Sequence, residues 1–227
     1  MAEIITVSID GMGGDNAPDM IVGGIELACS HNPDVRFLLF GDEAQLQPLL
    51  DENLKAKAVC EIRHTCDIVT MDAKPTAALR SGKNSSMRLA IDAVKNRESS
   101  AVVSAGNTGA LMAMATVVLR MLPGIDRPAI VTSFPTQNGD CVMLDLGANI
   151  ECDAKNLVQF AVMGEVFARY ELDIEQPSIG ILNVGVEGLK GSDSVRKAAT
   201  ILQESNLPIK LYGFVEGDDI GKGTVDV

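Results

Sequence analysis

The sequence predicts an α/β protein in three layers, α/β/α, with helices on both faces of a mostly parallel, mixed β-sheet. Short runs rich in β-branched residues alternate with stretches of helical pattern along the chain. Most of these runs end in a glycine turn that opens into a helix, which is typical of the carboxyl edge of a parallel sheet. One Asn-Gly pair between two apolar runs predicts a hairpin, and so a single antiparallel pair in the sheet.

The composition supports a packed globular protein. The 227 residues are 46% hydrophobic and 22% charged, which predicts a single α/β domain over residues 1–227. A net charge of −12 with 4% aromatic residues argues against nucleic-acid binding. The longest apolar run, around Gly109–Leu119, is shorter than the roughly 20 residues of a membrane span. Five cysteines without a CxxC pair or a secretory signal indicate reduced thiols in the cytoplasm.

The first half of the chain supplies four of the predicted strands. They are expected at Ile4–Asp10, Val35–Phe40, Val59–His64 and Ala101–Val103. Helices are expected at about Pro18–Ser30, at Glu43–Leu50, from Ser85 or Ser86 to about Lys95, and from the turn at Gly109 to Arg120.

The second half continues the pattern. Strands are expected at Ala129–Phe134, Cys141–Leu146, Ser178–Asn183 and Ile209–Phe214, with another beginning at Thr224. Asp153 is expected to cap a helix that ends near Tyr170, and a further helix is expected at about Ser192–Ser205. The first of these helices is apolar around most of its circumference, so a core or a subunit interface should bury it.

The turn Gly106–Gly109 is the strongest anion-site candidate from the residues alone. A glycine turn opening into a helix leaves backbone N–H groups unpaired, and the helix dipole favours an anion there. Asn107 and Thr108 add side-chain donors. An ordinary strand-to-helix connection would have the same glycines for backbone geometry.

The first glycine turn, Gly11–Pro18, does not fit a dinucleotide fingerprint. GxGxxG requires glycine where Asn16 stands, and Asp10 and Asp15 would repel a bare pyrophosphate. These carboxylates suit a metal or a hydrogen-bond scaffold, or they cap the following helix.

Ala73–Arg88 is the only locally basic segment. Its lysines and arginines, with a cap serine, could bind a phosphate or a phosphorylated carrier, or they could belong to a solvated loop. His31 and His64 are expected to be surface or edge residues, so neither a histidine triad nor a zinc site is expected.

Six motifs in one order resemble the bacterial phosphate:acyl-ACP acyltransferase family, PlsX. The blocks are Ile9–Pro18, Lys83–Arg88, Ser104–Met112, Pro123–Ala129, Leu144–Asn149 and Leu157–Gly164, and the resemblance extends from Ile4 to Val227. It implies a fold similar to isocitrate/isopropylmalate dehydrogenase and phosphotransacetylase. It also implies synthesis of acyl phosphate from acyl carrier protein thioesters and inorganic phosphate, for phospholipid synthesis. The resemblance further implies a homodimer that contacts the membrane peripherally.

The resemblance and the chemistry together give a set of candidate site residues. Phosphate is itself the nucleophile, so the protein need only orient it and stabilise the developing oxyanion. Lys190 and Asn107 are expected to be catalytic, although Lys190 could be a surface lysine. Phosphate or substrate binding is expected at Gly106, Thr108, Gly109, Gly147, Asn149, Asp15, Asn16, Lys83, Ser86 and Arg88. No cofactor and no metal are expected.

Two departures from the family pattern affect these expectations. The family's Lys-Gly-Asn-Glu block stands here as Lys190-Gly191-Ser192-Asp193. Family members also continue into an Asp-Gly-Phe-x-Gly-Asn block and the helices associated with membrane contact, which implies that this chain lacks the C-terminal part. The alternatives are a short-chain phosphotransacetylase using acyl-CoA and a non-catalytic fragment, and a metal-dependent decarboxylating dehydrogenase ranks last.

Overall fold

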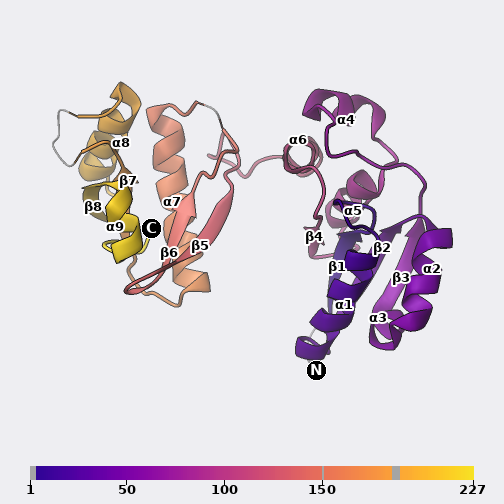
Figure 1. The fold of residues 1–227 in the computed structure, drawn as a ribbon. Helices are drawn as coiled ribbons and strands as arrows, with labels where there is room; N and C mark the ends of the chain where they lie inside the picture. The colour runs from indigo at the N-terminus through magenta and orange to yellow at the C-terminus, as the bar shows by residue number, and fades with distance from the viewer. Residues whose placement is uncertain (1–3, 150, 186–189) are drawn as a thin grey trace. The chain divides into compact units, whose positions relative to one another are not determined.

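The fold is described by a computed structural model covering residues 4–149, 151–185 and 190–227. Contacts within the chain divide it into two compact units, Met1–Arg120 and Met121–Val227 (Figure 1). Each unit has its own hydrophobic core, and the single domain expected from the sequence stays a prediction. Each is therefore described by itself.

The first unit contains a four-stranded, fully parallel sheet in the order β3-β2-β1-β4. Its strands are β1 (Ile5–Asp10), β2 (Val35–Gly41), β3 (Cys60–His64) and β4 (Ala101–Val103). Its helices are α1 (Asp19–His31), α2 (Glu43–Glu52), α3 (Leu54–Val59), α4 (Pro75–Ser81), α5 (Ser86–Lys95) and α6 (Thr108–Leu119). The parallel α/β fold predicted from the sequence is confirmed.

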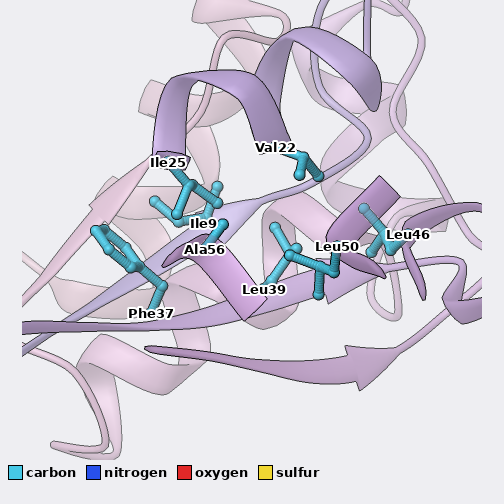
Figure 2. Close-up of a cluster of buried hydrophobic side chains, with 8 residues drawn as sticks. All are labelled: Ile9, Val22, Ile25, Phe37, Leu39, Leu46, Leu50 and Ala56. Atoms are coloured by element: carbon cyan, nitrogen blue, oxygen red, sulfur yellow. The ribbon is translucent and has the colours of Figure 1, made fainter. Parts of the chain in front are cut away.

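Alternating side chains of β2 produce the three layers of this unit. Phe37 and Leu39 pack with residues of α1, α2 and α3 on one face of the sheet (Figure 2). Leu38 and Phe40 contact α5 on the other face. All four side chains are buried, because successive residues of a strand point to opposite faces and both faces are covered.

Two short helices of the first unit are not predicted from the sequence. Leu54–Val59 forms α3, so the predicted strand at Val59–His64 begins one residue later, at Cys60. Pro75–Ser81 forms α4 inside the basic segment, where a loop is one of the expectations. Both helices are too short to show a clear 3.6-residue period, and contacts with α1 and α6 support them.

The second unit contains four strands and three helices among the described residues. The strands are β5 (Val131–Thr136), β6 (Gly139–Leu144), β7 (Ser178–Leu182) and β8 (Lys210–Val215). The helices are α7 (Ala154–Glu171), α8 (Asp193–Glu204) and the short α9 (Gly217–Lys222), which the sequence pattern does not predict. Ala161 of α7 and Ala198 of α8 pack with Ile179 and Ile181 of β7 to form the core.

The Asn-Gly hairpin is confirmed, but it does not belong to the parallel sheet. Strands β5 and β6 form an antiparallel pair of their own, and β7 and β8 form a separate parallel pair. The last residues of the chain lie between the two pairs. The amide of Val142 in β6 donates to Asp226 O (2.8 Å), and the amide of Gly180 in β7 donates to Val227 O (2.8 Å). The segment predicted to begin a strand at Thr224 therefore joins the hairpin to β7.

Candidate functional site

The carboxyl edge of the sheet in the first unit has a topological switch point. The chain moves from β1 outward through β2 to β3 and then returns to place β4 on the other side of β1. The switch point therefore lies between β1 and β4, whose connections lead to different helices, α1 and α6. In open α/β proteins ligands bind at this position.

Asp10 holds the connections around this switch point together. It is the last residue of β1, and only 1% of its surface is exposed. Its carboxylate accepts a hydrogen bond from Ser86 Oγ of α5 (2.5 Å) and one from Ser104 Oγ after β4 (2.7 Å). Three segments distant in sequence are thus joined by one buried carboxylate, because a buried charge must be hydrogen-bonded.

Glycines allow the loops after β1 and β4 to approach each other closely. A Cβ at Gly13 would overlap the Asp10 carboxylate and lie 3.0 Å from the amide nitrogen of Gly106. Gly14 has a φ of 107°, and a Cβ there would lie 3.0 Å from Ala105 O. The two loops therefore meet backbone to backbone, and these positions need glycine for space and conformation.

The N-terminus of α6 presents backbone donors at this edge. Asn107 is its N-cap, and the side-chain oxygen of Asn107 accepts from the amide of Ala110 (3.0 Å). Thr108 and Gly109 are exposed, and within the described residues their amides have no hydrogen-bond acceptor. Two amides at the positive end of a helix can bind an anion.

The side-chain amide of Asn107 has partners of its own. Its Nδ2 donates to Met71 O (2.9 Å) and Ala73 O (2.9 Å), with Thr70 O at 3.3 Å. In this structure, Asn107 therefore fixes the loop before α4 against the start of α6. The structure shows that Asn107 caps α6. Its catalytic role stays a prediction.

The basic segment is also partly engaged in structural contacts. Ser85 caps α5, accepting from the amide of Arg88 (3.3 Å), and Ser86 donates to Asp10, so a contact of Ser86 with phosphate stays a prediction. The guanidinium of Arg88 pairs with Asp92 at 3.1 Å. Lys83 is exposed just before the helix, so of these predicted binders it is the most accessible to solvent.

Asp15 and Asn16 lie in the exposed turn that leads into α1. The carbonyl of Asn16 accepts from the amide of Met20 (3.1 Å), so this residue helps to start the helix. Their predicted contact with phosphate stays a prediction.

In the second unit, the turn after β6 is closed by Asp145. Its carboxylate accepts from the amides of Ala148 (3.2 Å), Asn149 (2.9 Å) and Ile130 (3.1 Å). One side chain therefore satisfies three backbone donors of this turn and of the segment before β5.

The two residues of this turn that are expected to bind phosphate or substrate, Gly147 and Asn149, have hydrogen-bond partners within or next to the turn. Asn149 Nδ2 donates to the Asp145 carboxylate (2.8 Å) and to Pro128 O (2.9 Å), and the amide of Gly147 donates to Asp145 O (3.0 Å). Gly147 and Asn149 thus hold the turn together, because Asp145 supplies acceptors nearby.

Lys190 is exposed and lies after residues 186–189 of the predicted glycine turn, which fall outside the described residues. Asn183 Nδ2 donates to the carbonyl of Lys190 (3.1 Å) and to that of Gly185 (2.9 Å). Gly191 has a φ of 90° and leaves no room for a Cβ beside Asn183. Asn183 therefore fixes the backbone on which Lys190 stands, whereas the catalytic role of Lys190 stays a prediction.

An apolar groove of about 540 Å³ lies in the second unit between α7, β6 and the segment before β5. Every lining residue is apolar, and the groove is defined by Met121, Leu122, Ile125, Pro128, Ala129, Val131, Leu144, Val162, Met163, Val166 and Phe167. Its size and lining are typical of a site for a small apolar ligand.

Sequence reasoning proposes a hydrogen-bond scaffold as one role for the Asp10 carboxylate, but it does not identify the two serines that donate to it. From the sequence, Ser104 belongs only to a motif. An acidic residue at the end of a buried strand is a signal for a hydrogen-bonded carboxylate that joins several segments. The two serines that donate to Asp10, however, lie 76 and 94 residues away in the sequence. Only the sheet order brings them together.

Four of the five cysteine thiols are at least partly shielded from solvent. Burial raises the pKa of Cys60 to about 12, with a smaller contribution from Cys29, and it raises the pKa of Cys29, Cys141 and Cys152. Cys66 is exposed. Reactivity should therefore differ strongly among the thiols, since the thiolate is the nucleophile.

We expect alkylation at about pH 8.5, near the ordinary pKa of a thiol, to modify Cys66 first and to leave Cys60 unmodified until the chain unfolds. Peptide mass spectrometry at a series of reaction times measures the order of modification.

The stability of the fold should also depend on pH through Cys60. Because the folded state raises the pKa of Cys60 above its ordinary 9.0, its contribution to the free energy of unfolding should be fully present below pH 9 and fall as the pH rises toward 12. Equal alkylation rates at Cys60 and Cys66 would contradict the raised pKa of Cys60. If a Cys60→Ser variant lost as much stability at alkaline pH as the unchanged chain, another group would be responsible for that loss.

In the part of the chain that the structure describes, no helix is long and apolar enough to cross a membrane.

The chain matches the family described as "Fatty acid synthesis protein" over residues 5–227. It is 60% identical over 227 residues to a phosphate acyltransferase of Rhodospirillum rubrum and 57% identical to one of Paramagnetospirillum magneticum. Both comparisons cover 100% of this chain and 65% of the relative, so the chain spans less than two thirds of their length.

Solved structures show the same fold at low sequence identity. A phosphotransacetylase from Streptococcus pyogenes matches with a TM-score of 0.73 and 19% identity, over 96% of this chain and 70% of that one. The EutD phosphotransacetylase from Staphylococcus aureus matches with a TM-score of 0.66 and 16% identity, over 98% and 74%. These similarities confirm the α/β fold.

Proposed function

Because the chain belongs to the fatty acid synthesis protein family, the PlsX family, we propose that it serves the synthesis of acyl phosphate from an acyl thioester and inorganic phosphate. The observation that carries the proposal is the start of α6. There, the amides of the exposed residues Thr108 and Gly109 lack acceptors within the described residues, at the switch point of the parallel sheet.

The reaction needs no protein nucleophile. A phosphate oxygen attacks the thioester carbonyl, the new C–O bond forms, and the C–S bond breaks as the leaving thiolate takes up a proton. The protein lowers the barrier by holding phosphate in line and by stabilising the oxyanion. In this proposal the α6 amides hold the phosphate and Asn107 fixes their position, while a catalytic role of Lys190 stays a prediction.

The same exposed residues at the start of α6 would also serve a second candidate function, phosphate binding without turnover. Both candidates require that the first unit bind phosphate. They differ in whether acyl phosphate accumulates.

The test is an assay for acyl phosphate with a long-chain acyl carrier protein thioester and, separately, with acetyl-CoA. Turnover with the carrier thioester supports the proposal, and preference for acetyl-CoA indicates a short-chain phosphotransacetylase. If calorimetry detects phosphate binding but no acyl phosphate forms, the second candidate is supported. If neither phosphate binding nor acyl phosphate is detected, both candidates are contradicted.

We also propose that acyl carrier protein docks near the basic segment. Lys83 is exposed there and not paired in any described ion pair, and carrier proteins of this kind are acidic partners. Exposed charges at the rim of an interface mainly steer association.

Lys83→Glu should weaken carrier binding about three- to tenfold at low salt, with a smaller effect at high salt because ions screen exposed charges. Surface plasmon resonance at two ionic strengths measures it. Lys95→Glu is the matched control, because Lys95 is also exposed but lies at the far end of α5 from Lys83. Equal effects of the two variants would argue against docking at Lys83.

The acyl chain is proposed to bind in the apolar groove of the second unit, whose entirely apolar lining suits a fatty chain. Ala129→Phe should fill part of the groove and weaken binding of a long-chain acyl ligand at least about tenfold, whereas Ala129→Ser should change it little. Fluorescent fatty-acid displacement measures both. Unchanged affinity in the phenylalanine variant would exclude the groove.

A homodimer in the cytoplasm with peripheral membrane contact completes the proposal. Tyr170 of α7 is 82% exposed, which supports burial of this part of the helix by a second subunit.

A further inference from the structure

Strand register brings three different metal-binding side chains together at the end of β2 and β3. Gly41 is paired with His64, and the amide of Thr65 continues the ladder to Gly41 O (2.9 Å). Asp42 therefore lies beside the segment that holds His64 and Cys66. One ligand atom from each of these three side chains lies within 4.8 Å of the others.

The separation of two of these atoms matches tetrahedral zinc. Cys66 Sγ lies 3.6 Å from His64 Nε2. Zn–S and Zn–N bonds of about 2.3 and about 2.0 Å at a tetrahedral angle place the two ligand atoms about 3.5 Å apart. A thiolate, an imidazole and a carboxylate are all zinc ligands, and this mixed set disfavours Mg²⁺ and Ca²⁺, which prefer oxygen.

The surroundings already orient two of the ligands. The amide of Glu43 donates to His64 Nδ1 (3.1 Å), which turns Nε2 toward Cys66. The side chain of Gln45 and the amide of Ala44 donate to the Asp42 carboxylate and hold it at the start of α2. Each carboxylate oxygen keeps a lone pair for a metal.

We propose that Asp42, His64 and Cys66 form a Zn²⁺ site, with a fourth position left for water. The carboxylate and the thiolate together balance the charge of the ion. On binding, the Cys66 thiol loses its proton to solvent, and the proton on His64 moves from Nε2 to Nδ1. The Glu43 amide then exchanges its hydrogen bond to Nδ1 for one to water.

This site revises the expectation of no metal. The spacing along the chain gives His64 no evident partner and so assigns it to the surface. Asp42 is 22 residues before His64 in the chain, and the parallel pairing of β2 with β3 places it there. The bound ion would link the start of α2 to the end of β3.

The test is titration of the reduced, metal-free chain with Co²⁺, followed by displacement with Zn²⁺. We expect one equivalent to bind, with the visible ligand-field bands of a tetrahedral ion and a near-ultraviolet thiolate charge-transfer band. Cys66→Ser should abolish the charge-transfer band and weaken binding at least about tenfold, and His64→Gln should weaken binding similarly. Cys152→Ser and His31→Gln are the matched controls and should bind as the unchanged chain does.

Two further measurements separate metal binding from a folding defect. Asp42→Asn keeps an N-cap for α2, so its metal-free melting temperature should be nearly unchanged while its Zn²⁺ affinity falls at least about tenfold. The NMR signal of the Glu43 amide should shift only when metal is added. A Co²⁺ spectrum without the thiolate band, or one unaltered by Cys66→Ser, would show a hydrogen-bonded thiol and overturn the site.

Discussion

Gly13→Ala is expected to destabilise the first unit by about 2–3 kcal/mol, the usual cost of forcing an extra methyl group into a closely packed site. The new Cβ would overlap the buried carboxylate of Asp10 and press on the amide of Gly106. The loop after β4 would have to move, and α6 begins shortly after Gly106, at Thr108. Phosphate affinity should therefore fall at least about tenfold, or roughly 1.4 kcal/mol.

Gly24→Ala is the matched control for this change. Gly24 lies inside α1 and is exposed, and a Cβ added there would have nothing within 4 Å. Alanine there should stabilise the helix by about 0.5–1 kcal/mol and leave phosphate binding unchanged. Urea unfolding followed by circular dichroism, with calorimetry of phosphate binding, measures both variants. If Gly13→Ala bound phosphate as tightly as Gly24→Ala, the loop junction would not support the anion site.

Asp145→Ala should destabilise the second unit by about 2–4 kcal/mol, because donors left without an acceptor in a half-buried turn cost more than the bonds themselves contribute. The change removes the acceptor of three backbone amides and of the Asn149 side chain. Hydrogen exchange should accelerate in peptides containing Ile130 and the turn that follows β6 before it does elsewhere in the unit.

Asp140→Ala is the matched control for Asp145→Ala, because it removes a carboxylate from the same unit without removing the acceptor of the turn. Asp140 is exposed on β6, so its removal should change the unfolding free energy by less than about 0.5 kcal/mol. Phosphate binding by the first unit should be unaffected in both variants. Unaltered exchange at Ile130 in Asp145→Ala would show that another group holds the turn.

These two changes distinguish two kinds of glycine turn that look alike in sequence. Both follow a strand and contain glycine and asparagine. At α6 the residues Thr108 and Gly109 are exposed and their amides lack acceptors among the described residues, while after β6 the amides of Ala148 and Asn149 donate to Asp145. A turn with its own carboxylate is closed by that carboxylate, whereas a turn without one keeps its donors for a ligand.

Local chemistry along the chain is enough to specify the α/β class, most of the helices and strands, and their caps. Val35–Gly41 is a strand and Asp153 caps α7, because side-chain period and capping chemistry are properties of short windows. The family also follows from six local motifs in one order.

Which of these local features meet depends on the packing of whole elements. The hydrogen bonds of Asp10 to two distant serines, the separate sheet of the hairpin, and the approach of Asp42 to His64 and Cys66 all depend on strand order and register. Strand order in turn depends on how entire helices and strands bury their apolar faces, and no short window of sequence contains that information.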